Sequence, residues 1–208
     1  MTKRHTTRES WLKAATIKLR AHIKAETGLV VPPVSVSIGW PGGRGDKSGV
    51  IGQCWNAKVA ADGKAAIFIS PKLSDPVRIL DVLAHEMVHA LHPDAGHRGE
   101  FPKTAAAIGL VAPWTATNAS DDFAKTLKGI ARKLGPLGHG EIKTGVTLTR
   151  TDPKTGKTIT LTPTGSPKQG TRMLKIACPA DGTILRGSAK ALAIGLPTCA
   201  CGTEMVIA

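Results

Sequence analysis

The sequence predicts an α+β protein whose 208 residues divide into three parts. Short alternating apolar runs interleave with helical apolar stripes up to about residue 135, and the pattern then changes to loops, a hairpin and a cysteine-bearing β segment. We expect residues 1–120 to form one compact domain, residues 121–170 a basic helix, hairpin and linker, and residues 171–208 a small β module. No internal repeat is visible in the sequence.

The N-terminal region is expected to begin with a helix over residues 8–26, which Gly28 ends as a stop signal. Its apolar side chains recur at helical spacing. This stripe consists of Trp11, Leu12, Ala15, Leu19 and Ile23. The alternating VSVSI that follows Pro32-Pro33 predicts a strand. The glycine-rich WPGGRGDKSG lacks the GxxxxGK[ST] spacing, so we interpret it as a turn and not as a phosphate-binding loop.

A strand pair and three further helices complete the predicted compact region and its boundary. Strands are expected near residues 50–55 and 65–70, with the turn signal Ala61-Asp62-Gly63-Lys64 between them. Asp75 can cap a helix whose first turn holds Pro76, and this helix should stop at His92, before Pro93. Two more helices are predicted over 99–108 and 120–134, each ended by a glycine.

The last third of the chain is expected to contain little helix. GVTLTR and KTITLT alternate like strands, and TDPKTG between them predicts a hairpin. SPKQG is interpreted as a linker, and RMLKIAC opens the last module.

The composition excludes some classes of protein. No stretch approaches the roughly 20 consecutive apolar residues that a membrane helix needs, so no membrane partner is expected. The basic N-terminal segment has no apolar run and no small-residue cleavage site, so it does not resemble a secretory signal. A cytoplasmic location is the default expectation, which means the host cytoplasm if a phage encodes the chain. In that compartment the cluster of three cysteines near the C-terminus indicates metal more than disulfide, whereas Cys54 is expected to be a buried apolar residue.

The net charge of +13 lies outside the histidine-containing stretch. Residues 1–30 carry a net charge of +5 and residues 122–175 a net charge of +8, while residues 31–121 and 176–208 are neutral. A basic arm and a basic connector beside a neutral core favour a polyanionic partner, most simply non-specific DNA. The alternative is that these lysines and arginines are solvated surface charges.

The strongest chemical signal is His85-Glu86-Met87-Val88-His89 in the helix predicted from Pro76. Positions four apart project from nearly the same side of a helix, so the two imidazoles can chelate one Zn²⁺. Glu86 lies about 100° further around the helix, where it can face the attacking water without ligating the metal. This placement suits a general base.

A third ligand is available at His97 or His92. His92 shares the helical face, but it lies about 10 Å from His85 along the axis. His97 follows the turn PDAG, which can fold the chain back, so we prefer His97. Three protein ligands with one open position are typical of a catalytic site, and a structural zinc would have no use for Glu86. The alternative is a purely structural zinc, or none.

The segment HEMVHALHPDAGHRGEF resembles the SprT-like metallopeptidase family, whose eukaryotic relative is Spartan. The family pattern is HExxH, a short variable stretch, and His-Gly-x-x-Phe or a close variant. Here one residue is inserted between His97 and Gly99. CWNAKVAADGKAAIFISPKL is similar to the strand pair before the active helix, and AAAIGLVAPWTAT to the stretch after the third histidine in bacterial and phage-type members. The resemblance covers residues 8–118.

The resemblance implies a compact zincin-like fold, one catalytic Zn²⁺ and hydrolysis of peptide bonds. Matched residue by residue, it implies that His85, His89 and His97 are the ligands and that Glu86 is the base. In Spartan-like members the substrates are proteins attached to DNA.

Residues 172–208 resemble the zinc ribbon that family members often append. Cys199-Ala200-Cys201-Gly202 matches one knuckle, but Cys178-Pro179-Ala180-Asp181 has Asp where a second Cys is expected. Because Asp can ligate zinc, Cys178, Asp181, Cys199 and Cys201 are candidate ligands of a second, structural Zn²⁺. The alternative is a β module that has lost its metal and packs through apolar side chains alone.

Two classes of function therefore remain. The first is a monomeric zinc endopeptidase that acts on a protein substrate and is recruited to nucleic acid by its basic segments. The second is a zinc-containing nucleic-acid-binding or transcription-associated protein with little or no proteolysis. An intact Glu86 favours the enzyme, because a scaffold has no use for it.

Overall fold

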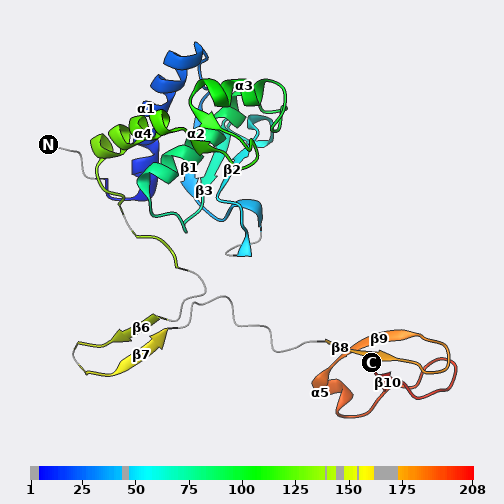
Figure 1. Cartoon of the computed structure of the whole chain (residues 1–208). Coiled ribbons are helices and arrows are strands. Elements are labelled where there is room, and N and C mark those ends of the chain that lie inside the picture. The colour runs from blue at the N-terminus through cyan, green and yellow to red at the C-terminus, as the bar shows by residue number, and fades with distance from the viewer. Residues whose placement is uncertain (1–4, 44–46, 139, 144–147, 154, 162–172) are drawn as a thin grey trace. The chain divides into compact units, whose positions relative to one another are not determined.

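The computed structural model describes residues 5–43, 47–138, 140–143, 148–153, 155–161 and 173–208 (Figure 1). The chain forms two compact units, Met1–Thr144 and Gly145–Ala208, and each is described by itself. Helices and small sheets occur together, so the predicted α+β class is confirmed. None of the described helices is both long enough and apolar enough to cross a membrane.

The first unit contains four α-helices, a three-stranded sheet and a two-stranded sheet. The helices are α1 (Arg8–Thr27), α2 (Pro76–Leu91), α3 (Glu100–Ala107) and α4 (Asp121–Leu134). The strands are β1 (Val34–Ile38), β2 (Gly52–Trp55), β3 (Ala65–Ile69), β4 (Leu110–Val111) and β5 (Asn118–Ala119). The 3₁₀ turns η1 (Pro41–Gly43) and η3 (Ala57–Val59) lie on either side of β2. The predicted helices and longer strands are present within one or two residues, whereas β4 and β5 were not predicted from the sequence.

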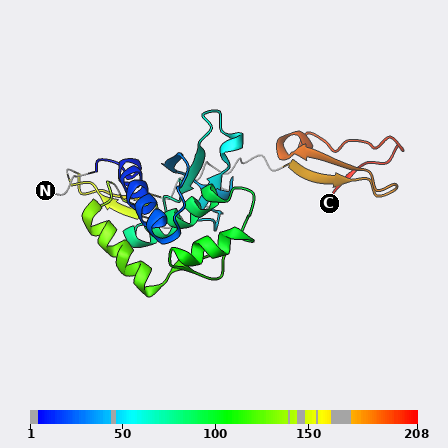
Figure 2. The same ribbon diagram turned by 90° about the horizontal axis from the view of Figure 1, so that it is seen from above.

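The three-stranded sheet has the order β1-β3-β2. β1 pairs with β3 in parallel and β2 pairs with β3 antiparallel, so both β1 and β2 are edge strands. Alternate residues of β3, namely Ala65, Ile67 and Ile69, are buried on one face, and α1 and α2 pack against the sheet. Figure 2 shows the helices of this unit gathered on one side of its strands.

Helix α1 has local signals at both ends. The Thr7 hydroxyl accepts a hydrogen bond from the Ser10 amide in a capping box, and Gly28 ends the helix with a φ of 73°. The predicted apolar stripe of α1 is completely buried. It packs into the same core as α2 and the sheet.

Helix α4 belongs to the first compact unit, and not to a separate connector as the boundary at residue 120 implied. Phe123, Leu127 and Leu134 are buried in the main core. The Trp11 indole N–H donates to the Gly135 carbonyl oxygen at 3.0 Å, which ties the end of α4 to α1. The reason is amphipathicity: the lysines and arginines that make this segment basic occupy one face, and the apolar residues at helical spacing occupy the other.

The second unit contains a hairpin and a small three-stranded sheet. The hairpin consists of β6 (Leu148–Thr151) and β7 (Thr158–Leu161), as predicted. The sheet has the order β10-β8-β9, and its elements are β8 (Met173–Ala177), β9 (Ile184–Ser188) and β10 (Val206–Ile207), with the short helix α5 (Ala189–Leu192) after β9. Ile176, Cys178, Cys199 and Met205 form its buried core. The predicted linker SPKQG lies outside the described residues.

The assignment of α4 to the core can be tested with two substitutions one residue apart. Leu127 is completely buried, whereas Lys128, the next residue of the same helix, is exposed. Leu127→Ala should lower the free energy of unfolding by about 2–5 kcal/mol, because it leaves a cavity. Lys128→Ala should change it by less than about 0.5 kcal/mol. Denaturant titrations of both variants measure the difference, and similar small effects would contradict the packing of α4.

Candidate metal centre

Helix α2 carries the site because its sequence combines strong end signals with a mainly apolar, buried middle in which a few ionisable residues are set. The Asp75 carboxylate accepts hydrogen bonds from the Val77 and Arg78 amides, and Pro76 occupies the first turn. Most residues from Ile79 to Ala90 are buried. The helix therefore runs through the core, and polar groups on its remaining face lie at the edge of that core.

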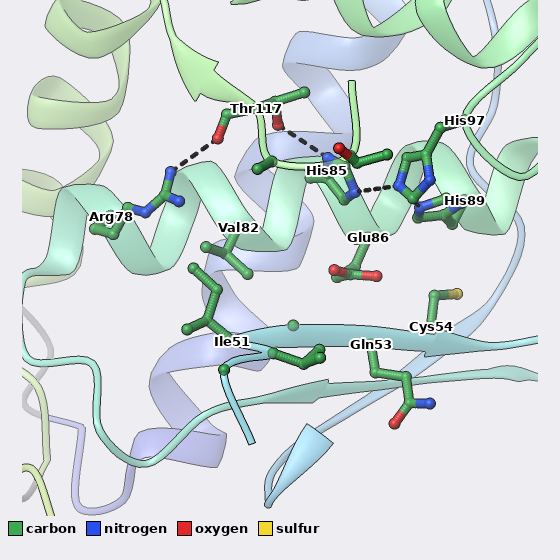
Figure 3. Close-up of a pocket in the computed structure, with 15 residues that line it drawn as sticks. Ile51, Gln53, Cys54, Arg78, Val82, His85, Glu86, His89, His97 and Thr117 are labelled. Carbon is green, nitrogen blue, oxygen red and sulfur yellow. Dashed lines mark hydrogen bonds between the residues drawn. The ribbon is translucent and has the colours of Figure 1, made fainter. Parts of the chain in front are cut away.

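Three imidazoles converge on this face (Figure 3). The Nε2 atom of His97 lies 3.1 Å from Nε2 of His89 and 3.3 Å from Nε2 of His85. Tetrahedral zinc with Zn–N bonds of 2.0–2.1 Å requires nitrogens about 3.3 Å apart. The three side chains can therefore hold a metal ion, and their spacing is compatible with zinc.

The electrostatic environment keeps these imidazoles neutral, as metal ligation requires. Burial is the largest cause: it lowers the pKa of His85 to about 3 and that of His89 to about 4, and it also lowers the pKa of His97. Neighbouring imidazoles add to the effect at His85 and His89. At neutral pH each of the three rings therefore offers lone pairs.

His97 reaches the centre because the chain turns back after α2. The amide of Ala95 donates to the carbonyl of His92 at 3.1 Å, and the amide of Arg98 donates to the carbonyl of Ala95 at 3.1 Å. Gly96 has a φ of 56°, which favours glycine within this turn. The structure thus places His97, and not His92, beside the other two histidines.

His92 points to a different partner. Its Nε2 atom lies 2.8 Å from the Thr104 hydroxyl of α3, and His92 itself caps the C-terminal end of α2. The three histidines that could hold a metal ion are therefore His85, His89 and His97, and His92 lies apart from them.

Thr117 is a positioning residue that the sequence did not reveal. It is only 4% exposed, and its hydroxyl lies 2.9 Å from Nδ1 of His85. A hydrogen bond from Nδ1–H to this oxygen leaves the lone pair of Nε2 directed at the metal position. Thr117 is 32 residues from His85 in sequence, and it lies directly before β5, so no local spacing connects the two residues.

Phe101 supports the three rings from α3. Its side chain is completely buried, and its ring centroid lies 5.0 Å from that of His85, 4.4 Å from that of His89 and 5.1 Å from that of His97. The sequence placed Phe101 only as the last residue of a motif. The structure shows that it packs against all three imidazoles and restricts their rotamers.

Glu86 lies next to the centre, in the wall of the same pocket (Figure 3). Its side chain is only 5% exposed, and burial raises its pKa to about 8. A Cβ atom at position 52 would collide with the Glu86 carboxyl and with Val82, so only glycine fits there. A divalent cation held by the three imidazoles would favour the ionised carboxylate.

The pocket has a volume of about 510 Å³ and is bounded by α2, by β2 with the residues before it, and by Thr115–Thr117. β2 is an edge strand of the sheet. Among the residues that the structure describes, no strand pairs with its other side, so its backbone groups there can pair with an added strand.

Cys54 differs from the expectation of a buried core residue. It is half-buried and lines the pocket on β2 (Figure 3). Burial, and then the charge of Glu86, raise the pKa of its thiol to about 12. The thiol is therefore protonated at neutral pH, and it is not grouped with the three histidines as a ligand.

A second cluster lies in the C-terminal sheet unit. Its members are Cys178, Asp181, Cys199 and Cys201. The sulfurs of Cys178 and Cys201 are 3.5 Å apart, and the Cys199 sulfur lies 3.3 Å from Oδ2 of Asp181. The structure thus brings all four predicted residues together, and they can hold a metal ion. Asp181 takes part through its carboxylate, whose pKa is lowered chiefly by the amide hydrogen bond from Thr183.

The basic residues predicted to bind polyanions are distributed over both units. Lys125, Lys128, Arg132 and Lys133 are exposed on α4, and Lys125 pairs with Asp122 at 2.8 Å. Lys143 pairs with Glu141 at 3.3 Å, and Lys157 is exposed on the hairpin. Lys154 and the side chain of Arg150 lie outside the described residues.

Comparison of the chain with family models, with curated proteins and with solved structures finds no match.

Replacing Thr117 tests whether its hydroxyl orients His85. Thr117→Val keeps the shape of the side chain but removes the hydrogen bond to Nδ1. Metal affinity at the histidine centre should fall about 10–100-fold, as is usual when such a partner is lost. Thr115→Val is the matched control, because Thr115 lines the same pocket and contacts none of the ligands through a described hydrogen bond. Competition titrations with a chelator measure both affinities, and equal values would remove the role of Thr117.

Burial of Glu86 predicts a pH-dependent stability of the metal-free protein. Its pKa is about 8 in the fold and 4.5 ordinarily, so the folded state holds a proton that the unfolded chain loses between these values. The free energy of unfolding therefore falls as pH rises through this window. Glu86→Gln removes this dependence. In the presence of chelator, its stability relative to wild type should increase from about pH 5 to about pH 8 by an amount on the order of a few kcal/mol.

The three histidines titrate in a window that overlaps this one below pH 6.5, but their contribution cancels when the two proteins are compared. Their lowered pKa values give stability that is lost as pH falls below 6.5, equally in both proteins. Denaturant titrations at the two pH values give the difference. A difference that does not change with pH would contradict a buried, protonated Glu86.

Proposed function

We propose that this protein is a zinc-dependent endopeptidase that acts on proteins associated with DNA. The observation that carries the proposal is the convergence of His85, His89 and His97 beside the buried carboxyl of Glu86, in a pocket open to one edge of a sheet. Three imidazole ligands with a fourth position left open are typical of catalytic zinc. The carboxyl beside the ligands has no evident structural use, because burying it raises its pKa and costs stability.

The histidines would hold Zn²⁺ through their Nε2 atoms, and the ion would supply Lewis-acid activation of the scissile carbonyl and the attacking water. Glu86 takes the proton of the water and passes it to the leaving amine. Thr117 holds the ring of His85 in the ligating tautomer. Phe101 packs against the rings and keeps them in place.

The position of β2 at the edge of the sheet favours a polypeptide as the substrate. One side of β2 pairs with β3, and no other described strand pairs with its second side, where an extended peptide can bind as an added strand. Gly52 at the start of this strand lets β2 approach Glu86 and Val82 closely, because a side chain at this position would collide with both. A peptide paired with β2 would pass through the pocket, where its backbone carbonyl can approach the metal centre.

The geometry also supports the proposal that the chain is a SprT-like metallopeptidase with a zincin-like domain and a zinc-ribbon-like C-terminal module. An active helix, a preceding strand pair and a third histidine on a returning loop are all present in the first unit. In the second unit, Cys178, Asp181, Cys199 and Cys201 would hold a second, structural Zn²⁺. The ion would then stabilise the small core that Ile176 and Met205 form with two of these cysteines.

Association with DNA is proposed from charge. Residues 122–175 carry a net charge of +8. The described basic side chains of α4 lie on its solvent-facing side, where phosphates can reach them. The second candidate function, a zinc protein that binds nucleic acid without proteolysis, shares this charge but leaves Glu86 unexplained.

Glu86→Gln separates the enzyme from the binding protein. The variant should keep both the fold and the histidine-bound zinc, but should lose peptidase activity by about 100-fold or more, as expected for a general base. His97→Ala should lose the zinc as well, whereas His92→Ala, whose ring contacts Thr104, should lose neither. Zinc content and cleavage of a DNA-bound basic protein, with and without DNA, are the measurements. Full activity of Glu86→Gln, or no zinc in protein prepared without chelator, would overturn the proposal.

The DNA-binding part is tested with a chain that ends at Thr144, because this keeps the first unit whole including α4. Its affinity for DNA should be much lower than that of the full chain, and the loss of affinity with salt should be less steep, because fewer counterions are released. Replacement of Lys125, Lys128, Arg132 and Lys133 by Gln in the full chain should also lower the affinity for DNA and its dependence on salt. Titrations at several salt concentrations measure both. Unchanged affinity in all proteins would mean that the charge is only solvated surface.

A further inference from the structure

The pocket beside the metal centre has a cationic end that the proposed reaction does not use. Its lining includes the carboxyl of Glu86 next to the histidines and the guanidinium of Arg78 at the other end (Figure 3). Between them the wall is formed by Val82 of α2 and Ile51, next to β2. A side chain that enters from the metal centre would therefore pass apolar surface and meet a guanidinium.

Arg78 is held in place by one of its nitrogens. Its Nη1 donates to the Thr117 carbonyl and to the Asn118 side-chain oxygen, each at 3.0 Å, and it also contacts the carboxylate of Asp81. The side chain remains 30% exposed. Among the residues that the structure describes, Nε and Nη2 have no hydrogen-bond partner, so these two donors are available to a ligand. A guanidinium fixed in this way can bind a carboxylate in a bidentate manner.

Asp81 does not cancel this preference for an anion. Its carboxylate is only 5% exposed, and burial is the main reason that its pKa is raised. The carboxylate is therefore buried away from the pocket, and the guanidinium is the member of the pair that lines it. Asp81 is also absent from the pocket lining.

Thr117 places Arg78 close to the reacting centre. Its hydroxyl bonds His85 and its carbonyl oxygen accepts from Arg78, so the metal ligand and the guanidinium are attached to the same residue. Along α2 the two residues are seven positions apart, about 10 Å by helical rise. Because the long side chain of Arg78 covers part of this interval, the side chain of the residue beside a peptide bond held at the metal centre has only the remainder to span.

We propose that Arg78 is a specificity residue, and that the pocket selects substrates with a carboxylate next to the scissile bond. This inference rests on the proposed peptidase function and names its substrate class. Two sources supply the same chemistry: the side chain of Asp or Glu in the peptide, or the free C-terminal carboxylate of a polypeptide. The first makes the enzyme an endopeptidase with acidic selectivity, and the second makes it trim chain ends.

Cleavage of matched peptides tests the proposal and separates the two sources. One pair of internal peptides carries Glu or Gln beside the bond that the full-length, zinc-loaded protein cleaves, and another pair ends in a free carboxylate or in an amide. The charged member of one pair should have a kcat/KM higher by about tenfold or more, since hydrogen bonds to charged groups are roughly twice as strong as neutral ones. Equal values within both pairs would overturn the proposal while leaving the peptidase intact.

Binding to an inactive protein gives a second readout that does not depend on activity. Zinc-loaded, full-length Glu86→Gln should bind the charged peptide about tenfold more tightly than its neutral partner, by titration calorimetry. If wild type cleaved nothing, this comparison would still decide about Arg78, so failure of the peptidase and failure of the specificity are distinguishable. Equal affinities for charged and neutral peptides would count against the proposal.

Substitution of Arg78 should remove the preference. For binding, Arg78→Met is combined with Glu86→Gln, and for cleavage it is made alone. In both cases the ratio of the values for the charged and the neutral peptide, affinity or kcat/KM, should fall to about one. Because this leaves the buried Asp81 without its partner, Arg78→Met with Asp81→Asn serves where the single variant does not fold. A merely structural Arg78 would change both peptides equally and keep the ratio. Lys103→Met removes an exposed charge outside the pocket and should keep the preference.

Discussion

The structure depends on one constraint: helix α2 must bury most of its surface and still present ionisable side chains along one line. The core closes around it from α1, the sheet and α4. His85 and Glu86 are consequently only 9% and 5% exposed. Burial of this kind is unfavourable for charged groups, so the imidazoles stay neutral and the carboxyl is driven toward its protonated form. A divalent cation at the convergence of the rings would accept the lone pairs of the neutral imidazoles and would stabilise the ionised form of the carboxyl. This is the physical reason to interpret the cluster as a candidate metal centre.

Elements from far along the chain make this arrangement rigid. Thr117 fixes His85 and, through its carbonyl, Arg78. Phe101 packs against all three imidazoles, and Gly52 lets β2 approach Glu86. A reaction that requires a metal, a base and a peptide backbone within one pocket needs each to be held in advance of binding. Within that pocket, the apolar side chains of Val82 and Ile51 lie between the three histidines and Arg78.

The second unit has few buried apolar residues to stabilise it. Its small sheet buries Ile176 and Met205 together with two cysteines, and many of its other large apolar side chains remain exposed. A core of this size supplies little stability by itself. A metal ion bound by Cys178, Asp181, Cys199 and Cys201 would add stability to this unit.

Periodicity and end signals by themselves determined the helices, the longer strands and the pairing of His85 with His89 around Glu86, because these features depend on residues within one or two helical turns. The third ligand was favoured over its neighbour by a turn signal, and only the folded loop brought His97 to the other two rings and sent His92 to Thr104. Thr117, Phe101 and Cys54 could not be assigned from spacing, since each comes from an element other than α2: Thr117 and Cys54 line the pocket, and Phe101 packs against the imidazoles. The basic character of residues 121–134 suggested a connector, but their buried apolar face packs into the core. Local sequence thus decided which residues share a helix face, whereas the burial of that face against distant elements decided which residues meet.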